Sequence, residues 1–221
     1  MSIDAVIFDL DGVLADSEVV WNDAKRALTE RSGGRWHPGA PRDMMGMSSP
    51  EWSRYIHEQL GVPLPPDEIS DAVVADLERR YREHVPLLPG ATDAVERLAA
   101  CWPLGLASSS NRPIIDLVLE RSGLRRFFSA SVSSEEVPRG KPAPDVYLEA
   151  ARRLGVGAER CAAIEDSANG LRSARAAGMR VVALPNPDYP PGDDALALAD
   201  VILDSLDELL PKAVEAPGPT E

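Results

Sequence analysis

The sequence predicts an α/β fold in which a doubly wound, mostly parallel sheet carries an inserted segment of helices. Short apolar runs recur along the chain, and each stops at polar or turn-forming residues, as strands buried on both faces do. Helical patterns separate most of these runs, and such alternation is typical of a parallel sheet. Residues 15–85 break the alternation and contain only helical patterns.

The apolar runs that we assign to strands share a polar residue or a proline at their carboxyl end. They are 5–8, 104–107, 161–164, 180–184 and 200–203. Proline in the first turn or glycine after the last turn delimits helices over about 113–123, 144–155 and 167–178. Ligands of such sheets bind beyond the carboxyl ends of the strands. We therefore expect Asp9, Ser108 and Glu165 to lie at one site.

The pattern divides the chain into three parts. We expect an α/β core of residues 1–14 and 86–213, a helical insert of residues 15–85 and a disordered tail of residues 214–221, which contains Pro and Gly and little that could pack. Within the insert, helices are predicted near 18–31, 50–60 and 67–84. Both junctions of the insert stand beside the predicted site.

Composition excludes several classes of protein. A chain of 221 residues buries enough apolar surface to fold without disulfides, and its two cysteines, Cys101 and Cys161, form no C-x-x-C pair. We expect a reducing, cytoplasmic location. With 23 basic and 36 acidic residues, a net charge of −13 and no basic cluster, nucleic acid is not an expected partner. No apolar run predicts a membrane span, and Asp4 and Asp9 stand where a secretory signal would be positive.

The segment after the first predicted strand carries the clearest chemistry. Asp9 and Asp11 are two positions apart, and Gly12 follows directly. Asp9 at the strand end can attack phosphorus, and Asp11 can protonate the leaving oxygen and later activate water. Gly12 allows a sharp turn that brings backbone N–H groups near phosphoryl oxygens. A plain turn is the alternative, and a calcium loop is another, although the EF-hand pattern puts its glycine sixth rather than fourth.

Four segments together resemble the motifs of the haloacid dehalogenase superfamily, within its helical-cap subgroup of β-phosphoglucomutase-like and phosphoglycolate phosphatase-like enzymes. Residues 9–17 resemble the first motif. The others follow in the expected order, as Ser108 within 105–111, Lys141 within 140–145, and the acidic pair within 164–170. The match extends over residues 6–184. It implies a Rossmann-like core with an inserted helical cap.

A magnesium ion is the cofactor that this resemblance implies. Carboxylates about 4 Å apart repel each other by roughly 1 to 4 kcal/mol, and a hard Mg²⁺ suits a cluster of oxygen ligands. The resemblance makes Asp9, Asp166 and the backbone carbonyl of Asp11 ligands, with Glu165 bound directly or through water.

The same resemblance assigns the phosphate-binding groups. Lys141 would place a positive charge against the nucleophile and the phosphoryl group, and Ser108 with the amide of Ser109 would bind a phosphoryl oxygen, beside Gly12. Taken alone, Lys141 could be a solvated loop residue, and the serines could be turn residues.

The insert acts as a cap over the core in this superfamily and supplies substrate contacts. Several of its residues, and one beside the second motif, could contact substrate or serve only in packing. They are Ser17, Glu18, Trp21, Met47, Ser48 and Asn111.

We therefore expect a monomeric, Mg²⁺-dependent phosphatase that hydrolyses a small phosphorylated metabolite, such as a sugar phosphate, through a phosphoaspartate on Asp9. Its partner would be that phosphate ester. A sugar-phosphate mutase is one alternative, but Trp21 and Ser49 stand where those mutases carry His and Arg. A dehalogenase would not need Asp11. A binding or regulatory module that keeps the fold without turnover is the alternative from another class. The physiological substrate stays open.

Overall fold

The protein is described here by a computed structural model that covers residues 2–45, 47–187 and 190–215. Within these residues, six parallel strands form one sheet in the order β3-β2-β1-β4-β5-β6. The strands are β1 (Ala5–Phe8), β2 (Leu104–Ser108), β3 (Phe128–Ser133), β4 (Cys161–Glu165), β5 (Arg180–Ala183) and β6 (Val201–Ile202). The predicted α/β fold with a parallel sheet is confirmed.

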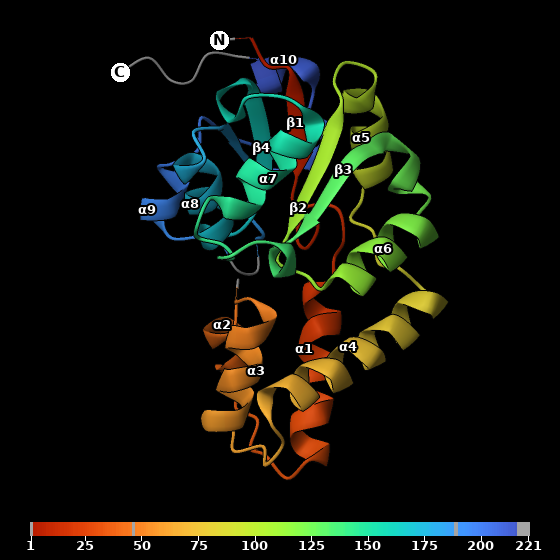
Figure 1. The fold of residues 1–221 in the computed structure, drawn as a ribbon, viewed down its shortest axis with the longest axis vertical. Coiled ribbons are helices and arrows are strands. Elements are labelled where there is room, and N and C mark those ends of the chain that lie inside the picture. Colours follow the sequence, from red (N-terminus) through yellow and green to blue (C-terminus); the bar gives the residue numbers. More distant parts are fainter. Residues whose placement is uncertain (1, 46, 188–189, 216–221) are drawn as a thin grey trace.

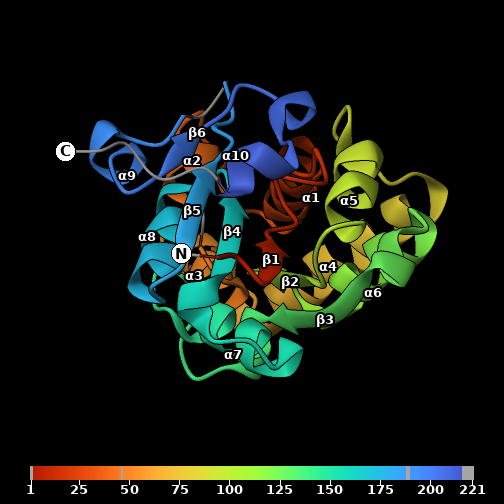
Figure 2. The same ribbon diagram turned by 90° about the horizontal axis from the view of Figure 1, so that it is seen from above.

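Helices cover both faces of the sheet, as Figure 2 shows. One face packs against α7 (Asp145–Leu154) and α8 (Ala168–Ala176), and α9 (Asp193–Leu196) packs on α8. The other face packs against the second group, α5 (Ala91–Ala99), α6 (Arg112–Arg121) and α10 (Pro211–Glu215). Alternate residues of β1 therefore belong to different cores: Val6 and Phe8 face the second group, whereas Ala5 and Ile7 face the first.

Four helices lie together beyond the carboxyl ends of the strands (Figure 1). They are α1 (Glu18–Arg31), α2 (Ala40–Asp43), α3 (Ser49–Glu58) and α4 (Pro66–Glu83), and we call residues 15–85, which contain them, the cap. The helix α4 packs against both α1 and α3. Side chains such as Ile56, Val73 and Leu77, fully buried between these helices, supply the apolar contacts that hold the cap together.

The two chain segments that join cap and core run side by side. The amide of Asp16 donates to the carbonyl of Pro86 at 2.7 Å, and the amide of Leu88 donates to the carbonyl of Leu14 at 2.9 Å. The cap is thus anchored immediately after the first motif, and our proposal for its limits remains residues 15–85.

Several local features differ from the sequence-based expectation, which did not name the helices α5 and α9. The strand β3 was not predicted, because at this edge Ser129 and Ser131 interrupt its buried positions and leave no continuous apolar run. The short helix α2 was not predicted either. The expected tail begins too early: Val214 is fully buried and, with Glu215, belongs to α10. Residues 216–221 of that expected tail lie outside the described part of the chain. In that part, none of the helices combines the length and the apolar character that crossing a membrane requires.

Candidate active site

Three neighbouring strands bring the predicted motifs to one edge of the sheet. Asp9 follows the last residue of β1, Ser108 ends β2 and Glu165 ends β4, and β1 lies between the other two. The registers align these ends, since Phe8 pairs with both Leu106 and Ile164. Parallel pairing therefore gathers groups that are far apart in sequence, since Ser108 and Glu165 follow Asp9 by 99 and 156 residues.

Lys141 joins the first and fourth motifs through two buried ion pairs. Its Nζ lies 2.8 Å from Asp9 Oδ1 and 2.5 Å from Glu165 Oε1, and its side chain is 3% exposed. Burial lowers the pKa of Lys141, but the facing Asp9 and Glu165 outweigh this effect and hold the pKa above its ordinary value. The lysine is therefore a fixed cation against the proposed nucleophile.

Glu165 is held on both of its oxygens by the protein. Oε1 also accepts a 2.8 Å hydrogen bond from the hydroxyl of Tyr147, while Oε2 accepts from the amides of Asp166 and Ser167 and from the Ser167 hydroxyl at 3.0 to 3.2 Å. Gly170 permits this arrangement, because a Cβ there would lie within 2.0 Å of the Glu165 carboxyl. Glu165 thus positions Lys141 and the turn that carries Asp166.

The carboxylates of Asp9, Glu165 and Asp166 form a cluster that could hold a metal ion. Each offers an oxygen within 4.8 Å of the others. Asp166 Oδ1 is buried and has no hydrogen-bond partner among the described residues. Burial, followed by Glu165 and Asp9, raises the pKa of Asp166 well above its ordinary value. Burial also raises the pKa of Asp9 to about 8; Lys141 opposes this rise, while Glu165 and Asp11 add to it.

The charges of this cluster fit a hard divalent cation. When ionised, the three carboxylates carry three negative charges, and Lys141 contributes one positive charge, so two negative charges remain uncompensated. A cation with oxygen ligands would neutralise them and would give the unpaired Asp166 oxygen a partner. We regard this match of charge and donor type as the fit of the residues to a metal.

Gly12 keeps the first motif close to Asp166. Its φ is +79°, and a Cβ at this position would lie 2.0 Å from Asp166 Oδ2. Any other residue would be strained in the backbone and would collide with the carboxylate.

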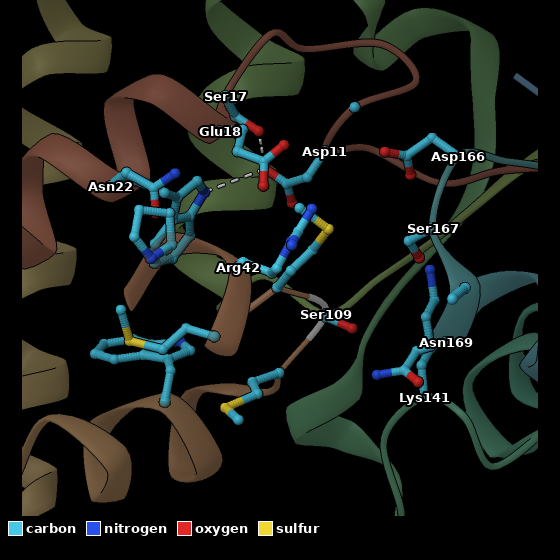
Figure 3. Close-up of a pocket in the computed structure, with 18 of the residues that line it drawn as sticks. Asp11, Ser17, Glu18, Asn22, Arg42, Ser109, Lys141, Asp166, Ser167 and Asn169 are labelled. Carbon is cyan, nitrogen blue, oxygen red and sulfur yellow. Dashed lines mark hydrogen bonds between the residues drawn. The ribbon is translucent and has the colours of Figure 1, made fainter. Parts of the chain in front are cut away.

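The Asp11 carboxylate is bound by both the cap and the core. Oδ1 accepts from the Ser17 hydroxyl at 2.5 Å and from the Trp21 indole nitrogen at 3.2 Å. Oδ2 accepts from the hydroxyls of Ser110 at 2.6 Å and Ser108 at 3.3 Å. Figure 3 shows the cap side of this arrangement, with Ser17 above Asp11. The orientation of Asp11 therefore depends on where the cap sits.

A cavity of about 430 Å³ lies between the core motifs and the cap (Figure 3). Pockets of a few hundred Å³ suit small ligands. The predicted site residues that line it come from both parts of the chain. They are Asp9, Asp11, Gly12, Ser17, Glu18, Trp21, Met47, Ser109, Lys141 and Asp166.

The other predicted residues stand behind or beside the cavity. Ser108 is fully buried, and its hydroxyl accepts from the amide of Ser110 at 2.9 Å besides reaching Asp11. Ser48 caps α3 in a reciprocal arrangement with Glu51. Asn111 accepts a 2.8 Å bond from the cap residue Ser49 and donates to Glu135. Glu165 has no exposed surface.

Sequence reasoning missed several residues of the site, chiefly Lys25, Arg42 and Tyr147. Lys25 could have been found, because Ser17, Trp21 and Lys25 recur every four residues and so share one face of α1. Arg42 gave no such signal, since α2 is a single turn among loops. Tyr147 lies on α7, and only the fold brings it to Glu165.

Known proteins resemble this chain over nearly its whole length. Hexitol phosphatase B of Escherichia coli strain K12 is 37% identical over 217 residues, covering 94% of this chain and 95% of its own. A probable pseudouridine-5'-phosphatase of Drosophila melanogaster is 32% identical, with 97% and 95% covered. Among solved structures, a CbbY variant from Rhodobacter sphaeroides in complex with xylulose-(1,5)bisphosphate matches with a TM-score of 0.86 at 29% identity, covering 96% of this chain and 99% of that one.

The family is established by a match over most of the chain. The model of the haloacid dehalogenase-like hydrolases matches residues 3–178, a stretch that contains the cap, the four motifs and most of the residues that line the cavity. The resemblance recognised in the sequence is thereby confirmed, and this chain belongs to the haloacid dehalogenase-like hydrolase family and is an enzyme of the hydrolase class.

Proposed function

We propose that this hydrolase is a Mg²⁺-dependent phosphatase, which cleaves a small phosphorylated metabolite such as a sugar phosphate through a phosphoaspartate on Asp9. The observation that carries the proposal is the position of Asp9. Its carboxylate lines the cavity, pairs with Lys141 at 2.8 Å and shares the acidic cluster with Asp166. The relatives named as a hexitol phosphatase and a probable pseudouridine-5'-phosphatase support hydrolysis of small phosphate esters.

Binding of the phosphoryl group would use groups from three motifs. The oxygens of the phosphoryl group would lie at the floor of the cavity. There they would contact the Lys141 ammonium, the backbone amide of Ser109 and the backbone N–H groups of the turn at Gly12. Asp9, Asp166 and the Asp11 carbonyl would hold the metal. Because protein donors already engage both oxygens of Glu165, we propose that it acts on the metal through water. When bound, Mg²⁺ would offset the charge of the phosphoryl oxygens.

The covalent step forms one bond and breaks another. A carboxylate oxygen of Asp9 attacks phosphorus in line with the ester oxygen, the P–O ester bond breaks, and Asp11 transfers a proton to the departing alcohol. Asp11 then removes a proton from water as that water attacks the phosphoaspartate. Inorganic phosphate leaves, and Asp9 is regenerated with Asp11 again protonated.

We also propose that the enzyme works as a monomer in the cytoplasm. The cytoplasmic location is supported by the two cysteines, since both Cys101 and Cys161 are free thiols. Size-exclusion chromatography with light scattering would test the monomer, which a mass near twice 23.8 kDa would contradict.

A phosphate-release screen tests the function. The purified protein is assayed with Mg²⁺ against sugar phosphates, hexitol phosphates, glycolate phosphate and nucleotides, beside two variants. Asp9→Asn removes the nucleophile and should abolish release, whereas Asp93→Asn makes the same change at an exposed position on α5 and should not. Release from no ester, or full activity of Asp9→Asn, would refute the proposal. Isomerisation of a hexose 1-phosphate in place of its hydrolysis would indicate a mutase.

A further inference from the structure

Lys25 brings a buried positive charge to the cap side of the cavity. It lies on α1, lines the cavity and is only 7% exposed. Its Nζ lies 5.3 Å from the centroid of the Trp21 ring and 5.0 Å from that of Trp52. Within the described residues, Lys25 has neither a hydrogen-bond acceptor nor an acidic partner for this ammonium.

Such a position is unfavourable for an ammonium unless something compensates for it. Burial lowers the pKa of Lys25 to about 8, although Asp11 and Glu18 raise it from a distance. The side chain is therefore still mostly protonated at neutral pH. The two indole rings recover part of the lost hydration energy through cation–π contacts, each worth about 0.5 to 2 kcal/mol. No full counter-charge is provided by the described residues around it.

The other buried lysine, Lys141, differs from Lys25 in having acidic partners. The chain has three lysines, and two of them, Lys25 and Lys141, line the same cavity. Lys141 is saturated by the carboxylates of Asp9 and Glu165. Lys25 faces the same space with no such partner, so its counter-ion has to come from what enters the cavity.

The cap residues that line the cavity around Lys25 combine positive charge with apolar side chains, as a binding site for an anion does. Trp21, Trp52, Met44 and Met47 line this side, and they lower the local polarity in which a charge pair would form. Arg42 is a second cation among the cap residues that line the cavity, and its side chain points into the cavity from α2 (Figure 3). Among the described residues, it has no acidic partner. In the described part of the chain, the floor has more acidic than basic side chains, whereas the cap side has two cations, Lys25 and Arg42, and one acidic residue, Glu18.

We propose that Lys25 binds a second anionic group, carried by the leaving group of the substrate, and so selects phosphate esters that also bear a carboxylate or a further phosphate. This inference rests on the proposed phosphatase function of the same cavity. The phosphoryl group that is cleaved would occupy the floor, and the second anion would pair with Lys25 under the cap. Lys25 would thus decide which ester is cleaved without touching the phosphorus.

Pairs of esters that differ only in the second anion test whether the enzyme prefers substrates that carry one. We would compare 6-phosphogluconate with glucitol 6-phosphate, 3-phosphoglycerate with glycerol 3-phosphate, and fructose 1,6-bisphosphate with fructose 6-phosphate. The first two pairs add a carboxylate and the third adds a phosphate. We expect kcat/KM of the parent enzyme to be at least about ten-fold higher for the anionic member of at least one pair, and that pair identifies the kind of anion.

Replacing the ammonium tests the residue itself. In Lys25→Met, the ratio of kcat/KM between the two members of the preferred pair should fall by at least about ten-fold, mainly through KM, and Lys25→Arg should restore part of it. Arg26→Met is the matched control. It removes a cation from the next position of α1, where the side chain is exposed and paired with Glu30, and it should leave the ratio as in the parent.

The results separate this inference from the function on which it rests. If the neutral members are preferred in all three pairs, or if Lys25→Met lowers both members of a pair equally, Lys25 does not bind a second anion while the phosphatase function stands. If neither these esters nor those of the wider screen release phosphate, the proposed function falls, and the inference falls with it.

Discussion

The indole nitrogen of Trp21 donates a hydrogen bond of 3.2 Å to Oδ1 of Asp11. Trp21 belongs to the cap and Asp11 to the first motif of the core, so this bond crosses the boundary between the two. The Ser17 hydroxyl reaches the same oxygen at 2.5 Å. The side chain that we propose as general acid and base is therefore oriented partly by the cap, and a displacement of α1 would change its direction.

Trp21→Phe should slow turnover more than it weakens binding. The variant keeps a ring beside Lys25 but loses the N–H that orients Asp11. Hydrogen bonds to charged groups contribute about 1.5 to 3 kcal/mol, so loss of one of the four donors should lower kcat by about 10- to 150-fold with a smaller change in KM. Steady-state kinetics on a released-phosphate assay measures both constants.

Trp102→Phe is the control for the loss of an indole N–H. Trp102 donates its N–H to the carbonyl of Ile3 in the core, away from the cavity, so this variant should lose stability but not kcat. A Trp21→Phe enzyme with the kcat of the parent would show that the bond to Asp11 has no part in turnover.

Gly12→Ala should disrupt the acidic cluster as well as the turn. A left-handed φ costs a residue with a Cβ about 1 to 2 kcal/mol, and the new methyl carbon would stand 2.0 Å from Asp166 Oδ2. Asp166 must then move, so we expect loss of Mg²⁺ affinity in calorimetric titration together with a lower free energy of unfolding in urea.

Gly61→Ala separates the effect of backbone strain from that of the contact with Asp166. Its φ is +72°, but a Cβ there would meet nothing within 4 Å, so only the backbone cost applies. The variant should lose about 1 kcal/mol of stability and keep its Mg²⁺ affinity. If the two glycine variants lose equal stability and both bind Mg²⁺ as the parent does, the close approach of Gly12 to Asp166 is unimportant.

Strands that form continuous apolar runs could be predicted, whereas the edge strand β3, which lacks such a run, could not. Strands β1 and β4 are buried on both faces, so their residues form uninterrupted apolar runs that end at Asp9 and at Glu165. The edge strand β3 exposes Ser129, and its apolar and polar residues alternate, so it lacks the continuous apolar run by which the other strands were identified. A continuous apolar run therefore identified a strand, even at the partly exposed edge strand β6, and the lack of such a run is the reason that β3 was missed.

Much of the site could be predicted because the residues of three motifs, Asp9, Ser108 and Glu165, stand at or next to a strand end. Lys141 is in no strand, and it was found only through the setting of its motif. Lys25 was missed because a charged residue on an amphipathic helix ordinarily faces solvent, although its spacing from Ser17 and Trp21 puts it on the same face of α1. Ser48 and Asn111 were expected near substrate, yet local polar partners, Glu51 and Glu135, engage them.

Asp166→Asn should weaken metal binding and stabilise the metal-free protein. The amide keeps the shape of the carboxyl but removes one of the clustered negative charges, and burial with neighbouring carboxylates already disfavours that charge. We expect at least about ten-fold weaker Mg²⁺ binding and a higher melting temperature in the presence of a chelator. Thermal unfolding with and without Mg²⁺ measures both effects.

Asp145→Asn is a suitable comparison, since Asp145 pairs with the exposed Arg139 outside the cavity. It should change neither the Mg²⁺ response nor the metal-free melting temperature by more than a few degrees. An Asp166→Asn protein that gains as much stability from Mg²⁺ as the parent would exclude Asp166 as a ligand.

Burial of Lys25 makes the stability of the protein depend on pH in a definite direction. The pKa falls from 10.5 to about 8 in the folded state, chiefly through burial, against the pull of Asp11 and Glu18. Between these values the unfolded chain binds a proton at Lys25 that the folded chain does not, so stability rises with pH. Below about pH 8 the destabilisation is complete, and above about pH 10.5 it is absent.

Lys25→Met should therefore be more stable than the parent at neutral pH, and its advantage should shrink as the pH rises. A shift of this size corresponds to about 3 kcal/mol at most, and loss of the two cation–π contacts, taken at about 0.5 to 1 kcal/mol each, offsets part of it, which leaves a gain of about 1 to 2 kcal/mol at pH 7. Urea unfolding of both proteins at pH 7, 8, 9 and 10 measures the difference, in which the titration of all other groups largely cancels. A difference in stability that stays constant over this range, or a variant less stable than the parent at pH 7, would mean that burial of the Lys25 ammonium does not lower the free energy of unfolding.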